Sequence, residues 1–207
     1  AESCIPDPPY EISQQMMCKY NKPKAVDFNT LQLYRWYRLD YLKKLHSKAL
    51  DEGFKIGIKT VRGAYMEKEN ERALEYNYPT PICGSKSESD SNYDKTVAYI
   101  VEHLDLISLF SGTHNELSSY KLIELMEQKG ISHDDNRIWF GQLYGMSDHI
   151  SYNLANKGYN VAKYLPFGPV RDVMPYLIRR AEENTSVAGQ TNRELELIKK
   201  ERNRRKI

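Results

Sequence analysis

Short apolar runs alternate with longer amphipathic stretches along this chain, and the alternation predicts strands and helices in turn. The apolar runs predict strands at 24–29, 54–61, 104–111, 137–142 and 160–164. The amphipathic stretches predict helices at 30–52, 67–76, 93–103, 116–129, 149–157 and 172–184, and a charged C-terminal helix or tail occupies 192–207. Residues 79–91 are expected to form a polar loop, and the opening AESCIPDPPYEI is expected to be the tail of a strand entering a Pro-rich loop.

This order of elements indicates the class of fold. A strand followed by a helix, repeated five times, favours an α/β fold with a parallel sheet and right-handed crossovers. Doubly wound sheets and TIM barrels both fit the pattern. Because five units are too few to close an eight-stranded barrel, the sheet is open or the units are part of a larger barrel. Residues 1–207 are expected to form a single domain.

The composition excludes several classes of protein. Lys and Arg number 30 against 28 Asp and Glu, so no overall electrostatic field favours nucleic acid as a partner. The three cysteines, Cys4, Cys18 and Cys83, lie far apart, which is simplest to interpret as a reducing compartment. The sequence has no GxGxxG fingerprint of a Rossmann site and no spacing of ligands that predicts a metal centre.

Chemically useful residues collect where the predicted strands end, which is where α/β folds place their active sites. The first strand is expected to deliver Asn29 and Thr30. The later strands are expected to deliver, in order, Lys59, Arg62, Gly63, Ala64 and Tyr65; Thr113, His114 and Asn115; Gln142 and Leu143; and Tyr164.

Two of these clusters indicate a bound ring. In VRGAY, the small Gly63 and Ala64 would let a flat ligand approach the backbone, while Lys59 and Arg62 supply positive charge. Cations near an electron-accepting ring stabilise the negative charge that develops when the ring is reduced. In SGTHN, His114 could bond to or stack on a ring, although a lone loop histidine is more often satisfied by nearby backbone.

The stretch 164–186 carries a candidate carboxylate site. Tyr176, Arg179, Arg180 and Glu183 recur at helical spacings of three, four and seven, so they share one helix face. Arg suits carboxylate binding because its planar fork donates paired hydrogen bonds. The simpler interpretation is a solvated face with an Arg–Glu pair, but Tyr164 ends the preceding strand and could converge on the same pocket.

Six stretches together resemble the proline dehydrogenase family, in the family's order and across nearly the whole chain. They are FNTLQLYRWYRLDYLKK, GIKTVRGAYMEKENERA, SGTHN, FGQLYGMSD, KYLPFGPV and MPYLIRRAEENTSV. The resemblance implies a distorted (β/α)8 barrel that binds FAD noncovalently. It also implies the first step of proline catabolism, in which L-proline is oxidised to Δ1-pyrroline-5-carboxylate by hydride transfer from C5 to flavin N5, with the electrons passing on to a membrane quinone.

The resemblance also implies roles for individual residues. Arg179 and Arg180 would bind the proline carboxylate, with Glu183 holding the arginine pair near the flavin. The residues expected around the proline ring are Tyr65, Leu143, Tyr164 and Tyr176. Lys59 would lie near the reactive flavin nitrogen. The other residues expected to line the FAD are Arg62, Gly63, Ala64, Thr113, His114, Asn115, Gln142, Thr185 and Ser186.

The chain resembles only the fourth to eighth βα units of the family, and the N-terminal barrel strands have no counterpart in it. One hypothesis is therefore an active enzyme once these strands are supplied. The alternative is a non-catalytic fragment or split subunit. A membrane quinone as acceptor would place the protein in the bacterial cytoplasm with peripheral contact to the inner membrane, or alternatively in mitochondria.

The basic run KKERNRRK near the C-terminus has two interpretations. The favoured one is a solvated helix end, where cations complement the helix dipole. The other is attraction to an anionic membrane surface. Nucleic-acid binding is the least favoured, because no aromatic residues are interleaved with the basic ones.

Overall fold

A computed structural model describes residues 7–186 and 188–205, with side chains described for 10–178 and 195–205. Within these ranges the chain forms one sheet of five parallel strands, in the spatial order β1-β2-β3-β4-β5. The strands are β1 (Asn29–Gln32), β2 (Ile56–Val61), β3 (Ile107–Gly112), β4 (Ile138–Leu143) and β5 (Val161–Tyr164). The predicted α/β class and the parallel sheet are thus confirmed.

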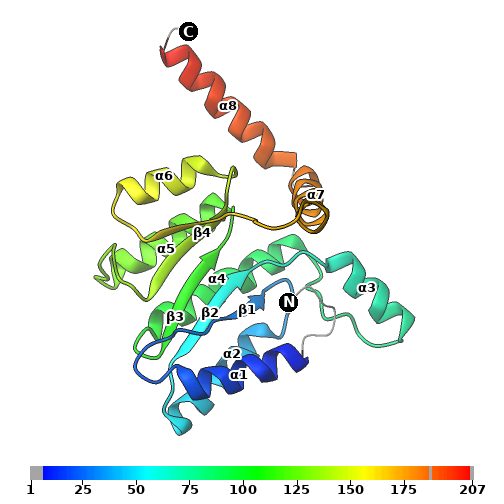
Figure 1. Ribbon diagram of the computed structural model, residues 1–207, viewed down its shortest axis with the longest axis vertical. Helices are drawn as coiled ribbons and strands as arrows, with labels where there is room; N and C mark the ends of the chain where they lie inside the picture. Colours follow the sequence, from blue (N-terminus) through cyan, green and yellow to red (C-terminus); the bar gives the residue numbers. More distant parts are fainter. Residues whose placement is uncertain (1–6, 187, 206–207) are drawn as a thin grey trace.

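The helices connect and cover these strands (Figure 1). They are α1 (Asp7–Tyr20), α2 (Arg38–Glu52), α3 (Met66–Glu75), α4 (Lys86–Glu102), α5 (Glu116–Gln128), α6 (Asp148–Asn156), α7 (Val170–Ser186) and α8 (Ala188–Arg205). Figure 1 shows α3 at one side of the molecule and α8 extending away from the sheet. In the described part of the chain, no helix has the length and apolar character needed to cross a membrane.

The sheet buries one face against helices. Ile56 and Ile58 of β2 and Ile107 and Leu109 of β3 belong to the buried core. On the same face the fully buried Tyr93 of α4 joins two strands, because its hydroxyl bonds to Thr60 (3.1 Å) and Ser111 (2.9 Å). Side chains alternate along a strand, so the intervening residues lie on the opposite face. This second face, called the open face here, carries Lys59, Val61, Phe110, Gly112, Trp139, Gly141, Leu143, Ala162 and Tyr164.

The beginning of the chain differs from the prediction. From Asp7 onward it is helix α1 rather than a strand tail and loop. Pro8 and Pro9 suggested a loop, but they occupy the first helical turn, where backbone N–H groups have no intrahelical partner. Tyr10 and Met17 of this helix are buried, and the Tyr10 hydroxyl donates to the Thr30 carbonyl oxygen at 2.8 Å.

The first strand and first long helix were also placed wrongly. The strand expected at 24–29 is at Asn29–Gln32, and the helix expected from residue 30 begins at Arg38. Asn29 and Thr30 therefore lie at the start of β1 rather than at its exit. The apolar residues at 31, 33 and 34 were compatible with a helix, but pairing of β1 with Ile58–Val61 of β2 decides for a strand. The stop at Gly53 is confirmed, since its φ is +67° and its N–H bonds to the Ala49 carbonyl oxygen.

Helix α4 begins inside the stretch that was expected to be a polar loop. Ser85 is its N-cap, with a hydroxyl that accepts a hydrogen bond from the Glu88 backbone N–H at 3.1 Å. Glu88 in turn accepts from the Gly84 N–H at 2.7 Å. This Ser-x-x-Glu spacing is a helix-start signal in the sequence, and it marks the helix seven residues before the predicted start at Tyr93.

Between α2 and α4, His46, Tyr99 and His103 form an aromatic cluster. His46 Nδ1 lies 2.7 Å from the Tyr99 hydroxyl, and the two histidine rings are 4.5 Å apart. Burial, and then the neighbouring His103, lower the pKa of His46 from its ordinary value of 6.5, although Asp105 opposes this. The folded protein therefore binds a proton at His46 less readily than the unfolded chain does.

We expect the free energy of unfolding to fall as the pH drops from about 7 to about 5, because protonation of His46 then favours the unfolded chain. The variant His46→Gln should flatten this dependence, since glutamine does not titrate. Urea unfolding across this pH range measures the effect, and His149→Gln on α6 controls for loss of a histidine elsewhere. An unchanged slope in His46→Gln would refute the assignment.

Candidate functional site

Lys59 projects from the middle of β2 onto the open face. Its ammonium nitrogen lies 5.6 Å from the centre of the Phe110 ring on β3. Burial lowers the pKa of Lys59. Among the described residues its ammonium has no carboxylate or hydrogen-bond acceptor. Because partial burial of a charge costs free energy unless the charge is paired, such a cation favours binding of an anionic or electron-rich ligand.

Glycines keep the open face flat around Lys59. A Cβ added at Gly112 would lie 3.1 Å from the Thr60 carbonyl oxygen and 3.2 Å from Lys59 Cε. A Cβ at Gly141 would lie 2.1 Å from the Phe110 ring. The side chains of Lys59 and Phe110 can therefore lie along the sheet only because the neighbouring strands carry no side chain at these positions. A flat surface of this kind suits a planar ring.

The VRGAY loop follows β2 and leads into α3. Gly63 has a φ of +113°, and a Cβ there would lie 1.4 Å from the Tyr34 ring. The group that lies against the backbone at Gly63 is thus the Tyr34 ring, and the approach of a flat ligand to Gly63 and Ala64 stays a prediction. Tyr65 is the N-cap residue of α3, and the Lys68 ammonium lies 5.9 Å from its ring centre. Ala64, between Gly63 and Tyr65, is partly exposed.

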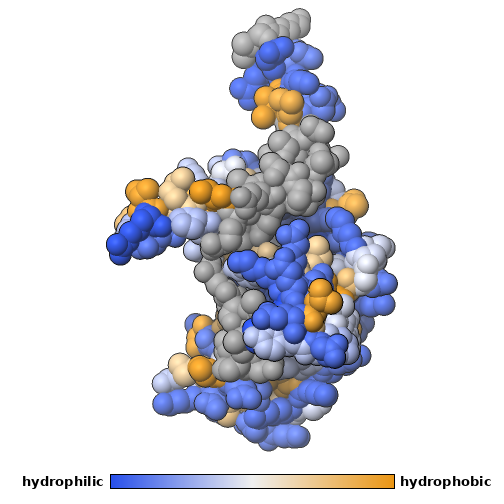
Figure 2. All heavy atoms as spheres, turned by 90° about the vertical axis from the view of Figure 1, so that its right-hand side faces the viewer, coloured by the Kyte–Doolittle hydropathy of each residue, from blue (hydrophilic) through white to orange (hydrophobic). Residues whose placement is uncertain are grey.

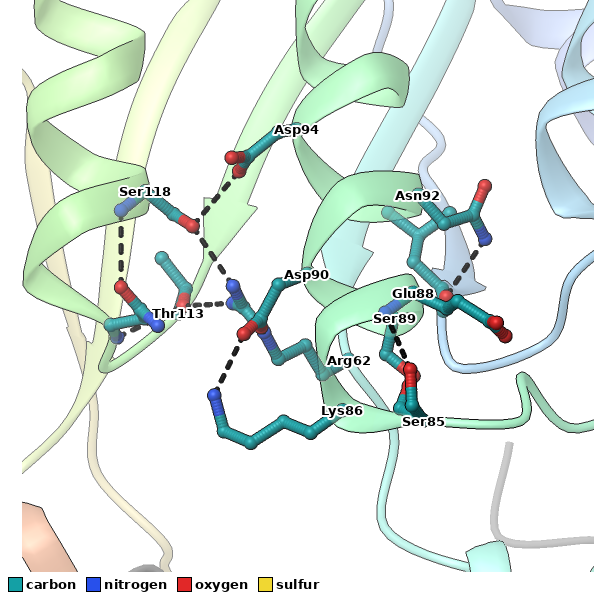
Figure 3. A network of polar contacts seen from close by, with 12 residues as sticks. Arg62, Ser85, Lys86, Glu88, Ser89, Asp90, Asn92, Asp94, Thr113 and Ser118 are labelled. Atoms are coloured by element: carbon teal, nitrogen blue, oxygen red, sulfur yellow. Dashed lines mark hydrogen bonds and ion pairs between the residues drawn. The ribbon is translucent and has the colours of Figure 1, made fainter.

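Arg62 is engaged by protein groups on all three sides of its guanidinium (Figure 3). Nε donates to Asp90 on α4 at 2.6 Å, Nη1 to Thr113 at 3.0 Å and Nη2 to Ser118 on α5 at 2.9 Å. The guanidinium carbon also lies 4.5 Å from the centre of the Tyr93 ring. Arg62 thus joins the end of β2 to two helices and to the loop after β3.

The last three residues of SGTHN, Thr113–Asn115, form that loop, because Ser111 and Gly112 end β3. The Thr113 hydroxyl accepts from the Asn115 N–H at 3.0 Å, and the Asn115 side chain caps α5 by accepting from the Ser118 N–H at 3.1 Å. His114 Nδ1 lies 2.9 Å from the hydroxyl oxygen of Ser147, which precedes α6. The loop is therefore fixed at both ends and beside its histidine.

Gln142 and Leu143 end β4 on opposite faces of the sheet. Gln142 is buried on the helix side, where its Nε2 donates to the Thr113 carbonyl oxygen at 3.2 Å and its Oε1 accepts from the Ser151 hydroxyl at 2.9 Å. Leu143 is on the open face and pairs with Tyr164 of β5. The structure therefore brings Leu143 and Tyr164 together, whereas the side chain of Gln142 supports the SGTHN loop.

Tyr164 and Tyr176 meet where β5 leads into α7. Their ring centres are 6.0 Å apart, with the rings nearly edge to face. Tyr164 is 56% exposed, so its ring is accessible from solvent. The predicted convergence of the strand end and the next helix is confirmed for this pair. Arg179, Arg180, Glu183, Thr185 and Ser186 lie on α7, but their side chains are outside the described residues.

Four residues near the VRGAY loop were not expected from the sequence. The Tyr34 hydroxyl donates to Glu69 Oε1 and lies 3.2 Å from Gln32 Oε1. Arg35 Nη2 pairs with the same Glu69 oxygen at 2.7 Å, and both side chains are almost fully buried. Correct placement of β1 would have put Gln32 at a strand exit. No sequence signal identifies the Arg35–Glu69 pair, because its members are 34 positions apart in different elements.

These features define a class of protein. A parallel α/β sheet carries cations, aromatic rings and glycines on its open face and in the loops after its strands, and these loops are where α/β-barrel enzymes place their active sites. Residues 8–193 match the family model for proline dehydrogenase.

Individual proteins are similar to this chain over most of its length. The chain is 37% identical over 204 residues to proline dehydrogenase 1, mitochondrial, of Drosophila melanogaster, covering 94% of this chain and 30% of that protein. It is 39% identical over 192 residues to carbapenem antibiotics biosynthesis protein CarD of Pectobacterium carotovorum subsp. carotovorum, covering 93% of this chain and 49% of that protein.

A solved structure is similar as well. Proline utilization A (PutA) from Bdellovibrio bacteriovorus, inactivated by N-propargylglycine, superposes with a TM-score of 0.82 at 26% identity, over 89% of this chain and 19% of that one. The chain therefore belongs to the proline dehydrogenase family, and its parallel five-stranded sheet with alternating helices matches part of the TIM-like barrel of the PutA structure. It spans less than half the length of each of these three relatives.

Proposed function

We propose that this chain binds FAD and L-proline and takes part in the oxidation of proline to Δ1-pyrroline-5-carboxylate. The observation that carries the proposal is the half-buried ammonium of Lys59, which has no carboxylate partner among the described residues and lies on a glycine-lined face, in a chain of the proline dehydrogenase family. Unrelated folds could share one of these features, but the family and the face together favour flavin chemistry on proline.

The cofactor fits the open face and the adjoining loops. Lys59 would hold the electron-accepting ring, and Gly63, Ala64, His114 and Asn115 would border it. Bound FAD would supply the acceptor for the hydride that leaves C5 of proline. The part played by Lys59 is electrostatic, because a cation close to the ring favours the negative charge of its reduced form.

The substrate would lie between the open face and α7. Tyr65, Leu143, Tyr164 and Tyr176 would surround the pyrrolidine ring, with the crossed Tyr164 and Tyr176 rings as one wall. Arg179 and Arg180 would bind the carboxylate and Glu183 would hold the arginines, since these positions share one face of the continuous helix α7 with Tyr176. Tyr164 would crowd a ring hydroxyl, which favours proline over hydroxyproline.

The electrons would pass to a membrane quinone, with the protein in peripheral contact with the membrane. Support comes from α8, which extends from the body and carries exposed Leu195, Leu197 and Ile198 next to its basic end (Figures 1 and 2). The charge available to lipid is reduced because Arg204 and Arg205 both pair with Glu201. The location would be the bacterial cytoplasm at the inner membrane or, as for the Drosophila relative by its name, mitochondria.

A second possibility is a subunit that is active only with another polypeptide. The observation in its favour is that β1 and β5 each pair with a strand on one side only, within the described residues. Unpaired parallel edges expose backbone donors and acceptors that another chain could bind. Such a subunit would still present Lys59 and the VRGAY loop, but would retain no flavin by itself.

The test is a visible absorption spectrum of the purified protein with FAD, recorded before and after addition of L-proline. We expect retained flavin bands that bleach with proline, and weaker bleaching with hydroxyproline. The variant Lys59→Met should slow bleaching by about 10²-fold or more, because it removes one preorganised charge. The control is Lys55→Met, which should behave as wild type. Lys55 immediately precedes β2, and its ammonium donates to the Asp105 carbonyl oxygen.

The outcomes separate the two possibilities. Retained flavin that proline cannot reduce would refute proline oxidation by this protein. Absence of retained flavin would favour the subunit, and would be checked by adding a polypeptide from a relative that supplies the remaining strands.

A further inference from the structure

The contacts of Arg62 point to a role other than holding a ligand. Its three nitrogen positions already donate to Asp90, Thr113 and Ser118 at 2.6–3.0 Å, and the side chain is only 23% exposed. Figure 3 shows the guanidinium between the first turns of α4 and the residues of the SGTHN loop. Three of the five guanidinium N–H groups, one on each nitrogen, are therefore directed at protein acceptors that hold the side chain in this position.

The acceptors of Arg62 are themselves held in place. Asp90 also pairs with Lys86 at 2.7 Å, and although burial alone would raise the pKa of Asp90, these two cations hold it below its ordinary value. The Ser118 hydroxyl donates to Asp94 at 3.0 Å, and Asp94 pairs with Lys121 at 3.4 Å. Charges of both signs thus form a chain across α4 and α5, with Arg62 at its centre.

The Thr113 hydroxyl transmits this arrangement to the loop. It accepts from Arg62 and also from the backbone N–H of Asn115, so it fixes the turn that presents His114 and Asn115. From the other side, Gln142 donates to the Thr113 carbonyl oxygen. If Arg62 is removed, one of these three hydrogen bonds of Thr113 is lost, and the turn can rearrange.

We propose that Arg62 and Asp90 are positioning residues for the cofactor site, which act by fixing the loop Thr113–Asn115 and do not touch the cofactor themselves. This inference rests on the proposed function. It changes the role expected for Arg62 from a residue that lines the FAD to one that shapes the wall beside it, and it adds Asp90 and Ser118 to the residues on which the site depends.

The test is a double-mutant cycle on FAD affinity, measured by quenching of flavin fluorescence in the intact protein. Arg62→Met and Thr113→Val should each weaken FAD binding by about ten- to hundredfold, the range for losing a hydrogen bond to a charged group. In the Thr113→Val background, Arg62→Met should have little further effect, because its contact with the loop is already gone. If the loss of FAD affinity in the double variant equals the product of the two single losses, Arg62 acts on the cofactor independently of Thr113. That result would overturn the proposal.

Arg137→Met is the matched control for loss of a bonded arginine. Arg137 also donates from three nitrogens, to Asp135 and to the Leu104 carbonyl oxygen, but it precedes β4 at the opposite end of the sheet. This variant should leave FAD affinity unchanged. An equal loss of affinity in Arg137→Met would show that the effect of Arg62→Met is one of general stability, and would also overturn the proposal.

Amide hydrogen exchange without FAD tests separately whether Arg62 fixes the loop Thr113–Asn115. The N–H groups of Asn115, Ser118 and Ser119 are bonded within the loop and the helix start, and should exchange at least tenfold faster in Arg62→Met but not in Arg137→Met. Unchanged exchange rates would refute the claim that Arg62 fixes this loop. If the unaltered protein binds no FAD, the proposed function and the cofactor role of Arg62 both fail. Faster exchange in Arg62→Met would still establish that Arg62 fixes the loop.

Discussion

Removal of one partner from the buried Arg35–Glu69 pair should destabilise the protein by about 3–5 kcal/mol, because the other charge is left without compensation. The two side chains are 1% and 3% exposed and 2.7 Å apart. Burial alone would lower the pKa of Arg35, but Glu69 raises it above its ordinary value. Glu69 also accepts from Tyr34, whose pKa is raised first by burial and then by this carboxylate.

Guanidinium chloride unfolding of Glu69→Gln and Arg35→Met measures the cost. The double variant Arg35→Met/Glu69→Leu should recover most of the loss, since replacement of a whole buried ion pair by apolar side chains is often close to neutral. A double-mutant cycle on these variants gives the coupling between the two residues. A loss below about 1 kcal/mol in both single variants, as is typical of an exposed pair, would contradict the expectation.

Arg38→Met is the matched control for Arg35→Met. Arg38 is also buried, but it has no carboxylate partner among the described residues and instead packs 4.2 Å from the Tyr10 ring centre and 4.6 Å from that of Tyr37. Its Nε and Nη2 have no hydrogen-bond partner in the part of the chain whose side chains are described. Methionine at this position removes a costly buried charge along with the ring contacts, so Arg38→Met should cost clearly less than Arg35→Met.

The second large effect is expected at Gly63. Alanine there must adopt a φ of +113°, which side chains rarely adopt, and its Cβ would overlap the Tyr34 ring at 1.4 Å. The strain alone costs on the order of 1–3 kcal/mol. Displacement of Tyr34 also breaks its bond to Glu69, so the loss of stability should exceed the strain. FAD binding should weaken with it, because the same loop carries Ala64 and Tyr65.

Gly130→Ala separates the two causes. Gly130 follows α5 with a φ of +64°, but a Cβ there would meet nothing within 4 Å. Its cost should be about 1–2 kcal/mol, the penalty for a left-handed backbone alone. Chemical unfolding of both variants gives the comparison. Equal losses for Gly63→Ala and Gly130→Ala would mean that Tyr34 moves aside freely, and that the contact between this ring and the loop contributes little.

Local signals in the sequence placed most elements correctly. The strands β2 to β5, the helices α3 and α5 to α7, and the end of α2 at Gly53 follow from apolar runs, amphipathic periods and glycine stops, each of which acts within a few residues. The errors fall where a local signal was weak or misread. The Pro-rich start of α1 predicts a loop because proline usually interrupts a helix, and the Ser85 cap of α4 lies within a polar stretch that also predicts a loop.

For the candidate site, the positions of the residues could be predicted from the sequence, but their contacts could not. The residues at the strand exits could be predicted, because parallel strands bring their carboxyl ends to one edge whatever the details of packing. What each of them contacts could not. Arg62 and Gln142 have side chains suited to a ligand, but in the structure they bond to Thr113, Asp90 and Ser151.

The sequence by itself determined the family, the α/β order of elements, and the gathering of Lys59, VRGAY, SGTHN and Tyr164 at one edge of a sheet, since these depend on short motifs and on chain order. Only the tertiary structure decided that β1 is a strand, that Arg35 is neutralised by Glu69, and that Arg62 supports the loop after β3. The physical reason is that burial and pairing are set by residues distant in the chain, whose approach no local pattern records.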